Sequence, residues 1–202
     1  MNPYIKLLEN QYYHIFNRGN NKENVFIQAK NYSYFLKRYD YYLSEYIDTF
    51  AYCLLPNHFH LLIRVKPYSQ FPLQTKTLKK LENDEKVSEQ FRLLFMSYAK
   101  SINIQEDRVG SLFQKNFRRK LVDNEKYFSH LVYYIHANPQ LHGICEDFRV
   151  YEHSSYERIL SDRSSKLFKE EVLKWFGSKE AYTAFHRERQ EINETKDYFI
   201  ED

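Results

Sequence analysis

The stretch DTFAYCLLPNHFHLLIRVKP, residues 48–67, decides the fold. It contains two short apolar runs, rich in aromatic and aliphatic residues, and such runs are typical of β-strands. Pro56 and Asn57 separate the runs and are a turn signal. We therefore predict strands over residues 48–55 and 58–67. Because so short a connection joins neighbouring antiparallel strands, the two strands should form a hairpin.

Two histidines, His58 and His60, interrupt the second of these strands, where leucines would be easier to bury. Successive strand residues point to opposite faces, so the two imidazoles share one face, while Phe59 and Leu61 share the other. Imidazoles about 6–7 Å apart along a strand can bind one cation between them. Two partly exposed histidines that pair with neighbouring acids are the alternative, since this spacing is common.

Patterns on both sides of the hairpin predict the remaining elements of the first part of the chain. In chain order, they are a strand and turn in 12–20, an amphipathic helix in 30–46, a lysine-rich polar linker in 68–87, a helix over 88–105 with Ser88 as its N-cap, a basic segment over 111–122 with a strand in its second half, and a helix over 124–139 that Pro139 closes.

The order of these elements predicts an α+β fold, a ferredoxin-like sandwich in which helices cover one face of an antiparallel sheet. Residues 1–145 would form this domain. Residues 146–202 are expected to form a C-terminal helical extension, with one helix in 165–177 and a charged, solvated tail from residue 185 onward.

The composition excludes several classes of protein. No apolar run is long enough to cross a membrane, and the first residues lack the apolar core of a signal peptide. Cys53 and Cys145 are the only cysteines, too few for a disulfide framework, so a cytoplasmic location is expected. The formal charge is only +3, which does not by itself indicate a nucleic-acid-binding protein. The 19 tyrosines suit single-stranded nucleic acid, although a codon bias also explains such an excess.

A second group of candidate residues lies on the helix predicted over residues 124–139. Its buried stripe consists of Phe128, Leu131, Val132 and Ile135, which follow helical spacing. Tyr134 lies on the flank of that stripe, and Asn138, four residues further, lies on the same flank. A flank residue can reach the exposed part of the sheet on which the helix packs. Position alone does not separate Tyr134 from the other tyrosines.

These groups together are the parts of a nuclease that forms a phosphotyrosine. A cation held by His58 and His60, with the Asn138 oxygen as a possible third ligand, would polarise the scissile phosphate. The Tyr134 oxygen would attack phosphorus, and the covalent intermediate would keep the energy of the phosphodiester bond. His130, four residues before Tyr134, is a candidate base for deprotonating the tyrosine.

Four blocks of sequence resemble, in the same order, those of the REP-associated tyrosine transposases, which are single-tyrosine HUH transposases. The blocks are YHIFNRGNNKENVF (13–26), AYCLLPNHFHLLIRV (51–65), LFQKNFRRKLVD (112–123) and YIHANPQLHGI (134–144). HSSY (153–156) also resembles the WSSY that follows the core in that family. Two departures are His153, in place of tryptophan, and the chain after residue 165, which matches nothing familiar.

The resemblance implies both an activity and roles for particular residues. His58 and His60 would be the metal ligands, Asn138 the third ligand and Tyr134 the nucleophile. The implied activity is Mg²⁺- or Mn²⁺-dependent cutting and joining of single-stranded DNA at hairpins. The REP-associated branch works as monomers, so a monomer is favoured over a homodimer.

Six cations are predicted to contact DNA, and they gather in two segments near the ends of predicted strands. The densest run, residues 115–120, has four cations and a phenylalanine, which suits phosphate contacts and base stacking. The six are Arg18, Lys22, Lys115, Arg118, Arg119 and Lys120.

Two other functions remain open. The chain would be a catalytically silent nucleic-acid-binding module if no reaction occurs at Tyr134. It would be a metal-dependent phosphoesterase if water, rather than Tyr134, is the nucleophile.

Overall fold

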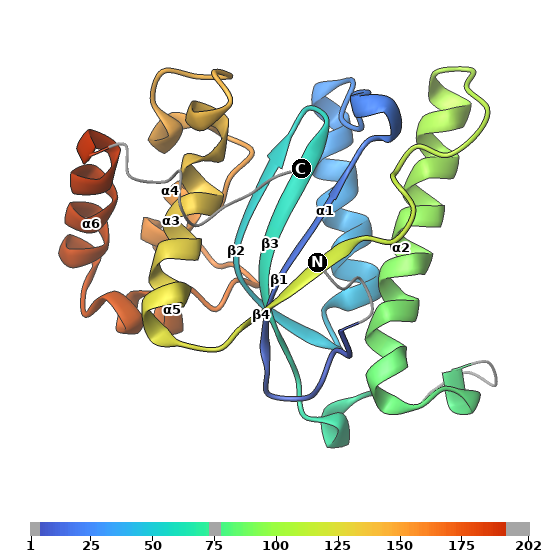
Figure 1. Cartoon of the computed structure of the whole chain (residues 1–202), viewed down its shortest axis with the longest axis horizontal. Helices are drawn as coiled ribbons and strands as arrows, with labels where there is room; N and C mark the ends of the chain where they lie inside the picture. Colours follow the sequence, from blue (N-terminus) through green and yellow to red (C-terminus); the bar gives the residue numbers. More distant parts are fainter. Residues whose placement is uncertain (1–4, 73–77, 193–202) are drawn as a thin grey trace.

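A computed structural model describes residues 5–72 and 78–192 and contains a four-stranded antiparallel sheet (Figure 1). The strands are β1 (Tyr12–Arg18), β2 (Ile47–Leu55), β3 (His58–Val65) and β4 (Arg118–Val122), in the order β2-β3-β1-β4. Pro56 and Asn57 form the turn of the β2–β3 hairpin, as predicted, because Leu55 pairs directly with His58. The hairpin therefore places His58 at one end of the sheet.

Two helices cover one face of this sheet, and the others lie on the opposite side (Figure 1). The first pair is α1 (Ala29–Leu43) and α2 (Asn83–Gln105). The remaining helices are α3 (Glu125–Leu141), α4 (Tyr156–Leu160), α5 (Lys169–Phe176) and α6 (Lys179–Ile192), and four short 3₁₀ turns occur at Asn20–Lys22, Tyr68–Gln70, Leu78–Lys80 and Phe148–Val150.

The α+β ferredoxin-like sandwich predicted from the sequence is confirmed by the order β1-α1-β2-β3-α2-β4 and by the strand order. The expected helices α1 and α2 share one face. The structure adds a layer on the other face, where α3 packs against β2 and β3. Helices therefore cover both faces, because the second face also carries apolar side chains, such as Phe50 of β2 and Leu62 of β3, that need a cover of their own.

Two hydrophobic cores follow from these layers. The first lies between the sheet and α1 and α2 and includes Phe35, Phe59 and Tyr98. The second lies under α3 and the C-terminal helices and includes Phe50, Phe128 and Tyr182. Because the second core contains residues from β2 as well as from α6, the segment after residue 146 packs directly on the predicted domain.

Two predicted boundaries are wrong. Helix α2 begins at Asn83 and not at Ser88, because the Glu82 and Glu85 side chains form a capping box there. Helix α3 continues to Leu141, since a proline as close to the end as Pro139 removes only one backbone donor. The part of the expected linker in residues 73–77 lies outside the described residues.

The predicted charged tail begins with a helix. Helix α6 covers Lys179–Ile192, and two of its residues, Tyr182 and His186, are fully buried. They are four positions apart and so lie on one face of the helix, whereas the exposed charged residues, such as Glu180, Arg187 and Glu188, occupy the other faces. The rest of the expected tail, residues 193–202, lies outside the described part of the chain.

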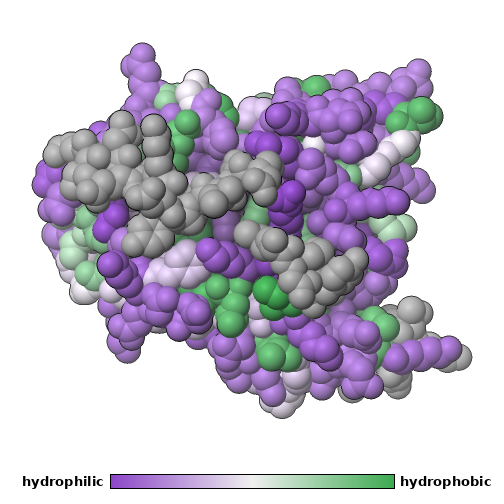
Figure 2. Space-filling model, viewed as in Figure 1, coloured by the Kyte–Doolittle hydropathy of each residue, from purple (hydrophilic) through white to green (hydrophobic). Residues whose placement is uncertain are grey.

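Figure 2 shows a largely hydrophilic face with small, scattered apolar areas. Among residues 5–72 and 78–192, none of the helices has the length and the apolar character needed to span a bilayer.

Candidate active site

The sheet face opposite α1 and α2 carries the histidines. His60 pairs across strands with Phe16 of β1, and His58 pairs with Arg18, so these side chains share a face. His14, two residues before Phe16, lies on that face as well. The rings of His58 and His60 are 5.2 Å apart between centroids, and the two residues are only 4% and 1% exposed. The expected same-face pair is therefore present, but α3 covers it.

Neighbouring side chains set the orientation of both imidazoles. His14 Nε2 lies 2.9 Å from His60 Nδ1, and Asn57 Oδ1 lies 2.6 Å from His58 Nδ1. An amide oxygen only accepts, so His58 Nδ1 donates and Nε2 carries the lone pair of the neutral ring. In each imidazole, one nitrogen is thus held by a neighbour and Nε2 is the nitrogen that would bind a cation. Such supporting bonds fix the tautomer and the ring orientation of metal-binding histidines.

Helix α3 brings Tyr134 and Asn138 to the same place. The Tyr134 ring is 5.5 Å from the ring of His60 and 6.2 Å from that of His14. One turn further along, Asn138 Oδ1 lies 3.2 Å from His58 Nε2. The predicted shared flank of Tyr134 and Asn138 therefore faces the histidines.

Tyr133 lies in a different environment. Its ring meets Phe148 at 5.8 Å and His186 at 5.7 Å, both in the core beneath the C-terminal helices. Burial raises the pKa of the Tyr133 hydroxyl. The two adjacent tyrosines therefore lie on different sides of α3: Tyr134 faces the sheet and Tyr133 faces α6.

His130, the candidate base, contacts α6. Arg189 of α6 donates a hydrogen bond of 2.7 Å to His130 Nε2. Burial, and then the charges of Arg189 and Lys126, lower the pKa of the imidazole. Because its accepting nitrogen is engaged by a guanidinium, His130 is a poor acceptor for the proton of Tyr134. The structure favours a packing role for this residue.

The arrangement of His58 and Asn138 fits a cation. His58 Nε2, with its lone pair, faces the Asn138 oxygen, which also only accepts, and the Asn138 amide nitrogen is buried with no hydrogen-bond partner among the described residues. Two ligands at right angles on Mg²⁺ are about 3.0 Å apart, close to the separation seen here. An Asn138 amide rotated by 180° would also satisfy His58.

Few side chains at this place could act as metal ligands. Within residues 5–72 and 78–192, no group of three or more His, Cys, Asp or Glu side chains is arranged to hold a metal ion. The candidate set instead combines two imidazoles with one amide oxygen. Such a set leaves coordination positions for water and phosphate oxygens, as is usual where Mg²⁺ binds a substrate.

The six predicted DNA contacts do not share one face. Arg118 pairs across strands with Phe16, and Lys120 pairs with His14, so both lie on the histidine face. Arg119 pairs with Ile15 on the other face, where it donates to Ser88 of α2 at 2.7 Å. The role predicted for Arg119 in DNA binding therefore has no geometric support, since strand alternation turns it away from the histidines.

The other three cations lie at the His58 end of the sheet. Arg18 ends β1, and Lys22 and Lys115 are exposed in the adjoining loops. Gly19 holds these loops close, because its N–H donates to Asn57 O at 2.7 Å and a side chain there would meet Glu23 O at 2.0 Å. The cations therefore border the hairpin turn that carries His58.

His153, which replaces the tryptophan of the resembled family, still packs as an aromatic residue. Its ring stacks on Tyr32 of α1 at 3.5 Å, with an angle of 10° between the planes. Burial lowers the pKa of His153, which favours the neutral ring. The substitution therefore keeps a ring at this position.

Three residues near the site were not found from the sequence: His14, Asn57 and His142. His142 follows the last turn of α3, and its ring is 4.9 Å from that of His58. The alternation of residues 12–18 could have identified His14, because it places a second histidine on a strand of the same sheet. His142 follows Asn138 by four positions, so the flank shared by Tyr134 and Asn138 could have identified it as well.

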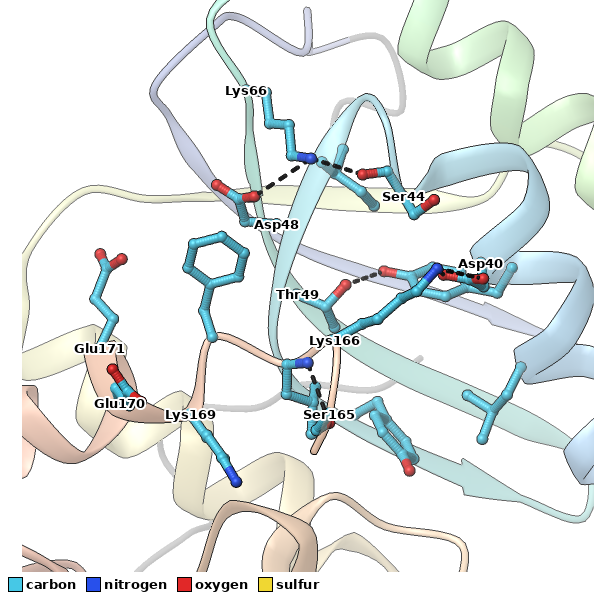
Figure 3. A pocket seen from close by; sticks show the side chains of 16 residues that line it. Asp40, Ser44, Asp48, Thr49, Lys66, Ser165, Lys166, Lys169, Glu170 and Glu171 are labelled. Atoms are coloured by element: carbon cyan, nitrogen blue, oxygen red, sulfur yellow. Dashed lines mark hydrogen bonds and ion pairs between the residues drawn. The ribbon is translucent and has the colours of Figure 1, made fainter. Parts of the chain in front are cut away.

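A separate cavity of about 820 Å³ lies at the edge strand β2, between α1 and residues 165–171 (Figure 3). Asp48 and Thr49, in its wall, pair with Arg64 and Ile63, at the opposite end of the β2–β3 hairpin from His58. Two lysines of the wall are paired within it: Lys66 bonds Ser44 O and Asp48, and Lys166 bonds Asp40. This cavity is a junction between the domain and the extension and is separate from the histidine site.

Comparison with known proteins agrees with the resemblance in the sequence. No family model matches the chain. A curated protein of Haemophilus influenzae, whose name assigns it to the REP-associated tyrosine transposases, is 27% identical over a match of 120 residues that covers 55% of this chain. The match spans only 60% of that protein's length.

A solved structure shares the fold. A REP-associated tyrosine transposase bound to a REP hairpin superposes with a TM-score of 0.56, at 19% identity, over 79% of this chain and 82% of that one. At this identity the likeness concerns the fold alone. In sequence over part of its length, and in fold over most of it, this chain resembles the REP-associated tyrosine transposases.

Proposed function

We propose that this protein is a metal-dependent enzyme that cuts and rejoins single-stranded DNA at hairpins through a covalent phosphotyrosine at Tyr134. One observation carries the proposal: Tyr134 and Asn138, one helical turn apart on α3, meet the two histidines of one sheet face. The resemblance to REP-associated tyrosine transposases supports the reaction class. The hairpin substrate is taken from the relative that was solved with a REP hairpin.

The metal would be held by His58 Nε2, His60 Nε2 and the Asn138 oxygen. Oxygen ligands and open positions suit Mg²⁺, and imidazoles also suit Mn²⁺. When bound, such a cation polarises the scissile phosphate and offsets the charge that develops on it. His14 and Asn57 keep the two imidazoles turned toward this place through their bonds to the Nδ1 atoms.

Tyr134 would supply the nucleophile. Its oxygen attacks phosphorus, and the bond from phosphorus to one deoxyribose oxygen breaks. That oxygen leaves as a hydroxyl, with the proton that Tyr134 gives up passing through solvent, and the other DNA end remains linked to the enzyme as a phosphodiester. Attack by a deoxyribose hydroxyl then reverses the step and joins the strand without an external energy source. Helix α3 holds the tyrosine ring against His60, so little ordering is needed when DNA binds.

Cations around the site would hold the DNA backbone. Arg118 and Lys120 lie on the histidine face, while Arg18, Lys22 and Lys115 lie at the His58 end of the sheet. Contacts of this kind position DNA without reading its sequence. Because Tyr134 reaches His60 within one chain, a monomer is sufficient for the site. DNA as the substrate also agrees with the cytoplasmic location expected from the sequence.

The proposal is tested by trapping the covalent product. A labelled hairpin oligonucleotide is incubated with the protein and Mn²⁺ and then run on a denaturing gel. We expect a band that resists denaturation, and digestion followed by mass spectrometry should place the nucleotide on Tyr134. A nucleotide on another tyrosine would contradict the assignment. Cleavage without an adduct would indicate a water-using phosphoesterase, and binding without cleavage would indicate a silent module.

A further inference from the structure

A buried chain of hydrogen bonds connects β2, the HSSY segment, α3 and α6. Tyr52 N of β2 donates to Ser155 Oγ at 2.8 Å, and Ser155 Oγ lies 2.8 Å from His136 Nε2 on α3. His136 Nδ1 lies 3.1 Å from His186 Nε2 on α6. His186 Nδ1 lies 2.8 Å from the carbonyl oxygen of Tyr182. Ser155, His136 and His186 are all 0% exposed.

The two ends of the chain fix the direction of every bond in it. The Tyr182 carbonyl only accepts, so His186 Nδ1 donates to it and the Nε2 of the neutral ring accepts. His136 Nδ1 therefore donates to His186, which leaves His136 Nε2 to accept from the Ser155 hydroxyl at 2.8 Å; the Tyr52 carbonyl oxygen, at 3.2 Å, is the more distant acceptor for the same hydroxyl. Ser155 Oγ in turn accepts from the N–H of Tyr52. Each polar group is satisfied with both imidazoles neutral, and burial lowers the pKa of each of them.

Helix α6 contacts α3 along a single stripe. Arg189 bonds His130, the His186 ring meets Tyr133, and Gln190 donates to Gln140 Oε1 at 3.0 Å. Together with His136, these α3 residues recur every three or four positions and mark one side of the helix. Tyr134 and Asn138 lie on the side that faces the sheet. Helix α6 therefore supports α3 from behind the candidate site.

We propose that Ser155, His136 and His186 are positioning residues, which hold α3 where Tyr134 and Asn138 meet the histidines of the sheet. The role in catalysis rests on the proposed function. The hydrogen-bond chain links α3 to β2 on one side and to α6 on the other, so it fixes the helix relative to the strand beside β3. A displacement of about 1 Å in such a group can slow a reaction a hundredfold.

The test interrupts the chain of hydrogen bonds near each of its two ends, by single substitutions in the full-length protein. His186→Leu keeps an apolar side chain of similar size but leaves His136 with only the longer contact of 3.2 Å to the Tyr182 hydroxyl. Ser155→Ala removes the partner of both His136 and Tyr52. His186→Gln restores an acceptor for His136. Arg187→Ala, on an exposed position of α6, is the matched control on the same helix. Val87→Ala, in the other core, controls for a general loss of stability.

Two measurements are made below the melting transition of every variant. Hydrogen exchange reports the opening of α3, and the rate of adduct formation at saturating DNA reports the positioning of Tyr134. In His186→Leu and in Ser155→Ala we expect the amides of residues 130–138 to exchange about tenfold faster, the factor that corresponds to the loss of one buried hydrogen bond. Adduct formation should slow about tenfold or more with unchanged DNA affinity, and His186→Gln should recover most of both losses.

The two controls and the wild type separate the possible failures. Arg187→Ala should resemble the wild type, and Val87→Ala should lower the melting temperature without slowing adduct formation. The proposal would be overturned if the amide hydrogen exchange of α3 were unchanged in both His186→Leu and Ser155→Ala. It would also be overturned if this exchange became faster while the rate of adduct formation stayed the same. If the wild type forms no adduct, the proposed function fails, whereas the exchange measurement still decides whether the chain holds α3.

Discussion

Two groups of buried histidines lie on opposite sides of helix α3, and they differ in how their hydrogen bonds end. Toward α6, His136 and His186 form a chain in which every donor has an acceptor within the protein. Toward the sheet, His58 Nε2 lies 3.2 Å from the Asn138 amide, and the Tyr134 ring lies 5.5 Å from that of His60. Burial alone therefore does not identify a functional histidine. A closed chain indicates a structural role, whereas imidazoles that converge with an amide and a tyrosine from another element are the arrangement expected of a functional site.

The largest effect is expected at Tyr134, which lies on the sheet side of α3. Tyr134→Phe should abolish the covalent adduct while metal and DNA binding remain, because only the hydroxyl is lost. Tyr133→Phe is the matched control on the other side of the helix and should retain most of the activity. A denaturing gel with a labelled hairpin measures both. An adduct that persists in Tyr134→Phe would show that the sheet side of α3 is not the reactive side.

His58→Ala should nearly abolish adduct formation and leave the fold intact. The ring is held by Asn57 and faces Asn138, and it is no part of either hydrophobic core. Isothermal titration with Mn²⁺ should show weaker metal binding, and the melting temperature should change little. A large drop in melting temperature with normal cleavage would mean that His58, like His136, supports the structure and does not bind the metal.

Lowering the pH should destabilise the fold through His186, the buried histidine at the α6 end of the hydrogen-bond chain. The direction of the effect follows from the lowered pKa of this imidazole. Burial lowers the pKa of His186 from 6.5 to about 3, so the folded protein keeps this ring neutral while the unfolded chain protonates it. The stabilisation is complete above pH 6.5 and is lost progressively as the pH falls toward 3. Between pH 7 and 5, the free energy of unfolding should fall by on the order of 2 kcal/mol more in the wild type than in His186→Leu. Urea denaturation at both pH values measures the difference, and equal losses would show that His186 is protonated in the folded protein.

The smallest effect concerns the two faces of β4. Arg118→Ala combined with Lys120→Ala should weaken DNA binding and lower the slope of log affinity against log salt by roughly one to two units. Arg119→Ala should leave that slope unchanged, because Arg119 bonds Ser88 on the other face. Fluorescence anisotropy at several salt concentrations measures both variants. Equal slopes for the two variants would mean that DNA does not lie on the histidine face.

The sequence predicts the parts of this architecture that depend on local patterns. The β2–β3 hairpin and the shared face of His58 and His60 follow from alternation and from the Pro56–Asn57 turn, and both are present. The flank shared by Tyr134 and Asn138 follows from helical spacing. Each of these features needs only residues that are close together in the chain.

The remaining features depend on contacts between distant segments. The bond between His14 and His60 joins residues 46 positions apart, and the bond between His136 and His186 joins residues 50 apart. No local pattern reports such a pairing. The sequence from residue 185 onward is rich in charged residues, and only the packing of α6 on α3 shows that His186 within it, and Tyr182 just before it, are buried.

The second hydrophobic core has a consequence for how the chain folds as it is synthesised. Its members run from Phe50 to Tyr182, whereas those of the first core end at Phe117. At about 5–20 residues per second, the ribosome needs roughly 3–13 s to go from Phe117 to Tyr182. During this interval α1 and α2 can already cover their face of the sheet, while the apolar residues of the other face still lack α6. The nascent chain is therefore most exposed to aggregation, and most dependent on chaperones, late in its translation.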